Sequence, residues 1–567
     1  MKILVIDGDP ILARALRDAG HTVDNIVPGG GVIDLPALVR HVGVEPDLLV
    51  QQERLGPRSY LVGLAEIGCP SVFWAVDSHL NLYWQRFYAL LFDAVLTPHV
   101  SLFKALPKAL RPPCLRRFAL FGSERAFTPH RERRHALSMW ARVDKHRPIR
   151  AWLIELLRAE GLYHTQDIDF EAMMRLYGDS RVVPNECIAN EVTLRLMEGA
   201  SAGCLVLSPD VGEDQNALLE PGTEFLIYHD GLELLDQVRW AAARPGRAEV
   251  IGLAARRRIL ADHLPASRAA ELLVLAANIE QGRLTGREAQ LALWLSLAWQ
   301  LRAGRIPIEP APHAEQGFAL LAGLPGHPAE KADQHPVAEL LADEALAQIF
   351  HLLAKDKGNT QGAARVLGFY RKLITDRRDA ALTSPSKTSP SREPALSLQA
   401  VSACSALALR ENILPMARAL SALRPGTNAL PGKSATEICL RWSADIQTAG
   451  ELFHSGFPFK PENGMLPEDA FGWLVFALHL TPEDRPALYG HFEKLLRSMP
   501  ALLHMYVGIL AEHSLAAPED WRVQLDYGMA SIKACRVSLG LAEAREAGEK
   551  ARAQGEERAF KARSRMS

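Results

Sequence analysis

Cysteine is scarce in this chain of 567 residues. Only seven cysteines occur, at scattered positions, and no two of them form a Cys-x-x-Cys pair. An odd count without such pairs fits reduced thiols in a cytosol better than a disulfide framework. No run approaches the ~18 consecutive apolar residues of a membrane span. Because Met1 and Lys2 lead directly into an apolar run, we expect no signal peptide and predict a cytoplasmic protein.

A strong charge of one sign is also absent. The 64 Lys and Arg residues nearly balance the 66 Asp and Glu residues, which leaves a net charge of −2 at pH 7. Wholesale binding to a phosphate backbone requires excess positive charge, so we do not expect nucleic acid as a partner. His130, His135, His146 and His164 are spaced too widely for the helical HxxxH or HExxH patterns. We therefore expect no metal ion and no bound cofactor.

Short apolar runs alternate with amphipathic stretches from residue 1 to about 280, which is typical of α/β folds. The runs favour a Rossmann-like first domain over 1–130 and a second one over 131–280. In the first domain we expect a helix at 60–68, and strands at 2–7, 21–27, 46–52, 71–77 and 93–98.

The chain becomes helical from about residue 286 onward. We expect a helical region over 286–380, a Ser/Pro-rich linker over 381–395, and a helical-repeat domain over 396–567. Within it, helices are expected at 433–453, 467–480, 483–513 and 518–547. Their short polar turns suggest stacked hairpins of the tetratricopeptide type, although no clean 34-residue repeat is present.

The segment 181–208 predicts a strand, a loop, a helix, a small-residue turn and a second strand. Asn190 lies near the expected start of the helix, and Arg195 and Glu198 are one turn apart on one face. At a sheet crevice, a carboxylate suits a ribose and a guanidinium suits a diphosphate, but the two could also form a simple surface ion pair. Upstream, Arg150 lies in a basic stretch that either lines the same crevice or is a solvated loop.

Asp77 and His79 directly follow the apolar run 71–76, and open α/β sheets place their ligand crevice at such strand ends. An Asp-x-His pair there can activate an acceptor hydroxyl as a general base. The alternative is local: Asp77 caps the following helix, and His79 makes a hydrogen bond nearby.

Four stretches resemble the CgeB-type (spore-maturation-protein) glycosyltransferases, which have the GT-B architecture of two facing Rossmann-like domains. The stretch 71–98 is similar to the family's strand, Asp-Ser segment and helix. The Arg-x-x-Glu pattern of 195–203 and the acidic loop of 210–228 resemble its second domain. The basic stretch 256–268, with His263 and Arg268, resembles its end motif.

The resemblance implies roles for individual residues. Glu198 would bind the donor ribose hydroxyls, and Arg195 would face the diphosphate. Asp210 and the loop 212–216, beginning with Gly212, would lie near the donor sugar. The donor is a nucleotide sugar, bound as a substrate.

The function expected from these features is transfer of a sugar from a nucleotide diphosphate to a hydroxyl of a glycan or protein acceptor, without a metal ion. The helical half would recognise the acceptor. One alternative is a non-catalytic scaffold, because position 190 is Asn where paired glutamates spaced by eight residues would place the first. Another is a DNA-binding regulator, because 357–378 resembles a helix-turn-helix, although an ordinary helical hairpin uses the same small residues.

Overall fold

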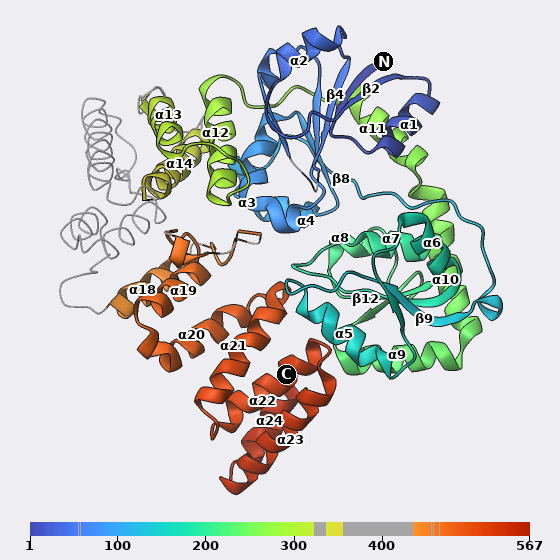
Figure 1. Cartoon of the computed structure of the whole chain (residues 1–567), viewed down its shortest axis with the longest axis vertical. Coiled ribbons are helices and arrows are strands. Elements are labelled where there is room, and N and C mark those ends of the chain that lie inside the picture. Colours follow the sequence, from blue (N-terminus) through green and yellow to red (C-terminus); the bar gives the residue numbers. More distant parts are fainter. Residues whose placement is uncertain are drawn as a thin grey trace, which may run out of the picture.

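The computed structural model of the chain describes residues 1–322, 336–354 and 435–566, apart from positions 55, 57, 449, 455, 458 and 464. The expected linker at 381–395 and the helix-turn-helix candidate at 357–378 lie outside the described residues. Figure 1 shows an α/β part, coloured blue to green, followed by a helical part, coloured yellow-green to red.

The first domain is built on a six-stranded parallel sheet with the order β2-β1-β4-β6-β7-β8. Its core strands are almost fully buried apolar runs, as expected of a parallel sheet covered on both faces. The strands are β1 (Lys2–Ile6), β2 (Thr22–Ile26), β4 (Leu48–Gln52), β6 (Ser71–Trp74), β7 (Ala94–Thr97) and β8 (Leu115–Arg117). The accompanying helices are α1 (Pro10–Asp18), α2 (Leu35–Val42), α3 (Ser78–Tyr88) and α4 (Val100–Ala105).

The helix expected at 60–68 is wrong. This segment forms the strand β5 (Ser59–Val62), which pairs in parallel with β3 (Gly31–Asp34), and only a single 3-10 turn follows. Tyr60 and Leu61 are both buried, and the Leu61 N–H donates to the Tyr88 hydroxyl at 2.8 Å. Short apolar runs do not distinguish strand from helix by periodicity, so tertiary pairing decides.

The second domain holds a five-stranded parallel sheet with the order β10-β9-β11-β12-β13. Two such Rossmann-like units in succession agree with the expected GT-B fold class. The strands are β9 (His135–Trp140), β10 (Tyr163–Thr165), β11 (Ser180–Pro184), β12 (Leu205–Pro209) and β13 (Leu226–Tyr228). The helices are α5 (Pro148–Arg158), α6 (Phe170–Gly178), α7 (Leu194–Ser201), α8 (Glu213–Asn216), α9 (Gly231–Ala243) and α10 (Pro245–Asp262).

Helix α11 (Pro265–Asn278) returns to the first domain, although the sequence places it in the second. Its Ala269 and Leu272 belong to the same buried cluster as Ile3 and Val5 of β1. The Arg268 side chain also donates to the Ala119 carbonyl at 3.0 Å. The boundary expected at 280 is therefore too late, because the apolar face of α11 is buried against the first sheet.

The first described helices after the α/β part share one hydrophobic cluster with α3, and the first of them packs directly on it. They are α12 (Gly286–Arg302), α13 (Pro310–Ala322), α14 (Pro336–Ala354), α18 (Ala435–Thr448) and α19 (Ala470–Leu480). Trp84 of α3, Trp299 of α12 and Trp473 of α19 lie in one continuous hydrophobic cluster. This part of the helical region therefore shares a core with the first domain.

The remaining described helices form a second group, and its middle members contact the second domain. The group comprises α20 (Arg485–Arg497), α21 (Leu503–Ala516), α22 (Trp521–Lys533), α23 (Val537–Ala553) and α24 (Glu557–Met566). Val507 of α21 and Tyr527 of α22 cluster with Ile149 and Trp152 of α5. The helical region thus contacts both Rossmann-like domains, and Figure 1 shows it running from one to the other.

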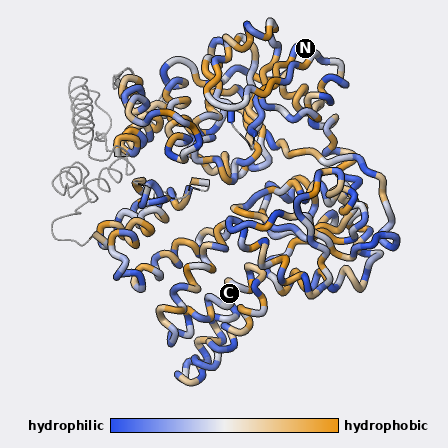
Figure 2. Tube along the Cα trace, in the orientation of Figure 1, coloured by the Kyte–Doolittle hydropathy of each residue, from blue (hydrophilic) through white to orange (hydrophobic). Residues whose placement is uncertain are grey.

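Two of the expected helices are each divided. The stretch 483–513 contains α20 and most of α21, since Pro500 cannot continue a helix. The stretch 518–547 contains α22 and most of α23, separated by Cys535 in a left-handed conformation. Hydrophilic and hydrophobic residues alternate along these helices (Figure 2). The predicted order, α/β followed by all-α, is confirmed, and no helix among the described residues is long and apolar enough to cross a membrane.

Candidate functional site

The carboxyl ends of strands from both sheets meet at the junction of the two Rossmann-like domains. His99, just after β7, accepts the Val192 N–H from the loop that precedes α7, at 3.1 Å. Asp214 of α8 accepts the Ser101 N–H at 3.0 Å and an Nη2–H of Arg117 at 3.0 Å. Ligand sites of open α/β sheets lie at such strand ends, so this junction is the candidate site.

Glu198 lies on α7, close against the sheet. A Cβ on the adjacent Gly199 would come within 2.8 Å of Val206 on β12, so a glycine is needed for this approach. Glu198 is 8% exposed, and its burial raises the pKa of its carboxyl to about 7, a rise that the nearby Arg195 guanidinium moderates. The carboxyl is held on a rigid element and keeps a small opening to solvent, as a ligand-binding group requires.

Arg195 is only 7% exposed, and its terminal nitrogens are directed at the protein. One donates to Asn185 Oδ1 at 3.0 Å and the other to the Trp140 carbonyl at 3.2 Å. The surface ion pair considered from the sequence is therefore wrong. Arg195 therefore links the carboxyl ends of β9 and β11 by hydrogen bonds, and its guanidinium does not point toward a diphosphate.

Arg150 is likewise engaged within the second domain. Its Nε donates to Glu186 Oε2 at 3.0 Å and its Nη1 to the Arg142 carbonyl at 3.0 Å. The solvated-loop alternative for Arg150 is thus excluded by its burial. Arg147, one turn earlier, pairs with Glu191 at 3.0 Å and has the more exposed side chain of the two arginines. Arg147 is therefore the guanidinium that faces the junction.

Three further candidates lie on loops at the carboxyl ends of β11 and β12. Asn190 is exposed and has a left-handed backbone with a φ of 59°, directly after Ala189 at 49°. Asp210 is exposed, and its Oδ1 accepts the Gly212 N–H at 2.9 Å. Gly212 has a φ of 87°, which only glycine adopts readily. These loops border the site, but no contact joins the three residues to Glu198 directly.

Asp77 is the N-cap residue of α3, yet its side chain makes no capping hydrogen bond. The capping role considered from the sequence is therefore wrong. Burial, the Glu53 carboxylate and Glu191 raise the pKa of Asp77 to about 7, whereas Arg58 and Arg147 oppose the rise. A carboxyl that titrates near neutrality and has no structural hydrogen bond is suited to proton transfer.

His79 is the second residue of α3 and faces His99. It is 4% exposed, and neither ring nitrogen has a hydrogen-bond partner among the described residues. The local hydrogen bond that the sequence suggests for His79 is therefore absent among the described residues. Its ring centroid is 4.9 Å from that of His99. Burial lowers the pKa of His79 to about 3, so it stays neutral and is a weaker base than Asp77.

Three residues at the junction are not singled out by the sequence: Glu53, His99 and Glu186. Each follows a strand or lies in a loop at a carboxyl end, and this position is the one signal that could have found them. Their partners lie far away in the sequence, and local patterns do not identify such partners.

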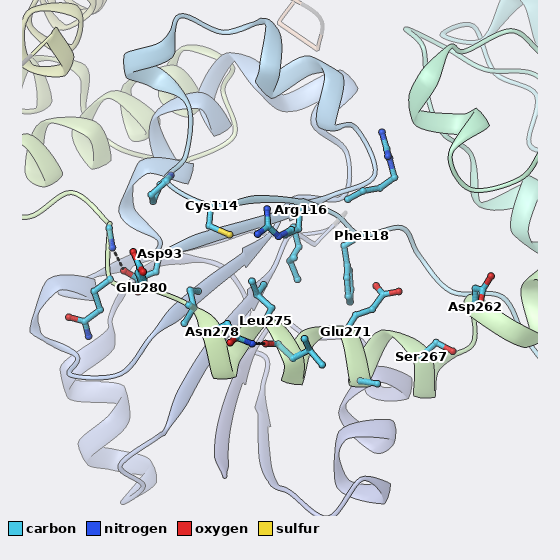
Figure 3. Close-up of a pocket in the computed structure, with 18 of the residues that line it drawn as sticks. Asp93, Cys114, Arg116, Phe118, Asp262, Ser267, Glu271, Leu275, Asn278 and Glu280 are labelled. Carbon is cyan, nitrogen blue, oxygen red and sulfur yellow. Dashed lines mark hydrogen bonds between the residues drawn. The ribbon is translucent and has the colours of Figure 1, made fainter.

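The described residues bring together no group of three or more His, Cys, Asp or Glu side chains that could hold a metal ion. A pocket of about 1090 Å³ lies elsewhere in the first domain, between β8 and α11 (Figure 3). Cys114, Arg116 and Phe118 line one wall, and Glu271 and Leu275 line the other. None of the sequence-predicted site residues lines this pocket.

Comparison with solved structures finds likenesses over about half of the chain. A sucrose-phosphate synthase from Thermosynechococcus elongatus is 14% identical, with a TM-score of 0.36, over 49% of this chain and 98% of that one. A glycosyltransferase from Rickettsia africae is 12% identical, with a TM-score of 0.36, over 48% and 97%. Anabaena HepE, in complex with UDP and glucose, is 13% identical, with a TM-score of 0.36, over 49% and 100%.

Sequence comparison gives a more specific result. No curated protein matches the chain. A family model described as glycosyl transferase-like matches residues 101–274, which include Glu198, Asp214 and the whole second sheet. The prediction of a glycosyltransferase is thereby supported, and residues 101–274 are similar to the glycosyl transferase-like family.

Proposed function

We propose that the chain transfers a sugar from a nucleotide-diphosphate donor to a hydroxyl of a glycan or protein acceptor. The observation that carries the proposal is the uncapped carboxyl of Asp77, with a pKa of about 7, beside the matched transferase-like domain. Asp77 is close enough to Arg147 and Glu191 of the second domain for their charges to shift its pKa. Acceptor and donor groups would therefore meet at the domain junction.

Glu198 is the donor-binding residue in this proposal. Its carboxylate would accept hydrogen bonds from the ribose hydroxyls. Arg147 replaces Arg195 and Arg150 as the group opposite the diphosphate, because its side chain is more exposed than theirs, although it too is paired, with Glu191. Backbone N–H groups at the start of α7 add positive potential, so the transfer needs no metal ion.

The chemical step is a substitution at the anomeric carbon. The bond from that carbon to the diphosphate oxygen breaks, and the electron pair leaves with the nucleoside diphosphate. The acceptor oxygen forms the new glycosidic bond and gives its proton to the Asp77 carboxylate. His79 lines the same end of α3 and remains neutral, so it orients groups and does not take this proton.

The finer features of the family resemblance remain predictions: the CgeB-type subfamily, tetratricopeptide-like repeats, acceptor recognition by the helical region and a cytoplasmic location. The helical region contacts the first turn of α3 closely. A Cβ on Gly456 would lie 1.8 Å from the Leu80 carbonyl oxygen, one turn from Asp77. This proximity supports a role for the helical region on the acceptor side.

The test is a screen of nucleotide sugars, scored by release of nucleoside diphosphate from the full chain. We expect one donor to be consumed by the wild type and by Glu155→Gln, a control at an exposed position of α5. Glu198→Gln should weaken nucleoside-diphosphate binding about 10- to 100-fold, as loss of a charged hydrogen bond predicts. If no donor is consumed and millimolar nucleotide does not stabilise the wild type, the chain is the non-catalytic scaffold.

A further inference from the structure

His99 contacts both Rossmann-like domains. It is 2% exposed and lies between β7 and α4 of the first domain. Its Nε2 accepts the Val192 N–H of the second domain at 3.1 Å. An acceptor at Nε2 places the ring proton of the neutral imidazole on Nδ1. The Nδ1 atom is buried.

A path of hydrogen bonds connects this contact to the proposed base. The His99 N–H donates to Thr97 Oγ1 at 3.1 Å, and Thr97 Oγ1 lies 3.2 Å from the hydroxyl of Ser78. Ser78 directly follows Asp77 in the chain, and Val192 directly follows Glu191. The path therefore runs from Ser78, which is next to Asp77, to Val192, which is next to Glu191 of the second domain.

We propose that His99 is a positioning residue, which holds the loop before α7 against the start of α3 and so sets the distance between the bound donor and Asp77. The inference rests on the proposed function. The loop leads into α7, which carries Glu198, so a displaced loop would displace the donor relative to the acceptor. A misplacement of about 1 Å can reduce turnover by about 100-fold.

The chemical state of His99 is consistent with this role. Burial, together with the nearby His79, lowers the pKa of His99 to about 3, whereas Asp214 and Glu191 oppose this decrease. The charged and titratable groups around His99 are the His79 ring on α3, Asp214 on α8 and Glu191 in the loop before α7. The imidazole therefore stays neutral near pH 7 and keeps the Nε2 lone pair available to Val192.

Two substitutions distinguish the contribution of the Nε2 acceptor from the contribution of the volume of the ring. His99→Phe keeps a ring of similar size without the acceptor, and His99→Gln places an amide oxygen near the position of Nε2. The full chain is assayed with its best donor for kcat and acceptor KM, and titrated with the nucleoside diphosphate. We expect kcat to fall at least tenfold in His99→Phe, with nucleotide Kd within about twofold of wild type. His99→Gln should recover kcat to within about threefold.

Wild-type kcat in His99→Phe would overturn the inference. So would an equal loss of kcat and nucleotide affinity that His99→Gln does not rescue, because this pattern indicates a purely structural residue. If His99→Phe does not fold, His99→Asn replaces it, since its shorter amide cannot reach Val192. A wild-type chain that consumes no nucleotide sugar refutes the proposed function itself, and the role of His99 with it. An active wild type with indifferent His99 variants refutes the inference alone.

Discussion

Glu53 accepts the backbone N–H of Asp77 at 2.8 Å. The same carboxylate accepts the Val76 N–H at 2.9 Å and a side-chain N–H of Asn81 at 2.8 Å. Glu53, at the end of β4, therefore satisfies the backbone where the chain enters α3. Because this anchoring falls to Glu53, the Asp77 side chain is left without a structural hydrogen bond and is available to a substrate.

The pH dependence of transfer should follow Asp77. The base must be deprotonated, so kcat/KM is expected to rise with pH, to pass its midpoint near 7 and to level off above it. Asp77→Asn should lower kcat by about 100- to 10,000-fold, the usual contribution of a general base. Initial rates between pH 5 and 9 measure both effects. A wild-type midpoint near 4 would contradict the assignment, as would near-normal turnover in Asp77→Asn.

The contact between Asp214 and the first domain should stabilise the domain junction. Asp214 is buried and accepts from Ser101 and Arg117, so Asp214→Ala leaves these donors without their partner. We expect the free energy of unfolding to fall by about 1–3 kcal/mol, measured by urea denaturation.

The neighbouring Glu213 provides the control for this measurement. It is exposed, and its closest cation, Lys104, lies 3.9 Å away, so Glu213→Ala should change stability by less than about 0.5 kcal/mol. Equal effects of Asp214→Ala and Glu213→Ala would show that the junction does not depend on Asp214.

The contact between the helical region and α3 should not tolerate a side chain at position 456. Gly456 has a φ of 76°, and its Cβ would clash with Leu80, so Gly456→Ala is expected to lower Tm and expose this contact to proteolysis. Gly490→Ala is the control, because Gly490 is an exposed residue of α20 with open space around it. A Tm for Gly456→Ala that is equal to or above that of Gly490→Ala would refute the close approach.

Removing only one partner of the buried ion pair between Arg302 and Glu468 should strongly lower the free energy of unfolding. Both side chains are buried, so Glu468→Gln leaves a buried guanidinium uncompensated and should cost about 3–5 kcal/mol. Adding Arg302→Met should recover most of this loss, as measured by chemical denaturation. A double variant less stable than Glu468→Gln would argue against the pair.

The same pair predicts acid sensitivity. Burial by itself raises the pKa of Glu468, but Arg302 and His351 outweigh burial and hold it below its ordinary value. A depressed carboxyl pKa stabilises the fold above about pH 4.5, and the stabilisation is lost as the pH falls below that value. The acid-induced loss of stability should therefore be smaller in the double variant than in the wild type.

Local sequence patterns predicted most of the α/β part. The apolar runs that form β1, β4, β6 and β7 are buried on both faces, so their composition alone indicates a parallel sheet. The patterns failed at 60–68, where pairing with β3 decides the conformation, and at α11, whose apolar face suits either domain. They also singled out Asp77, which follows a strand end, and Glu198, one turn from Arg195 on the same helix face, as candidates.

The sequence by itself therefore determined the order of an α/β part followed by a helical part and indicated the region of the candidate site, since burial periodicity and strand-end positions are local properties. Only the tertiary structure decided what each side chain does there. It turned Arg195 inward, anchored the start of α3 through Glu53 and joined His99 to Val192. Each of these contacts links residues between 10 and 93 positions apart, and such pairings depend on how the two sheets and their loops pack together.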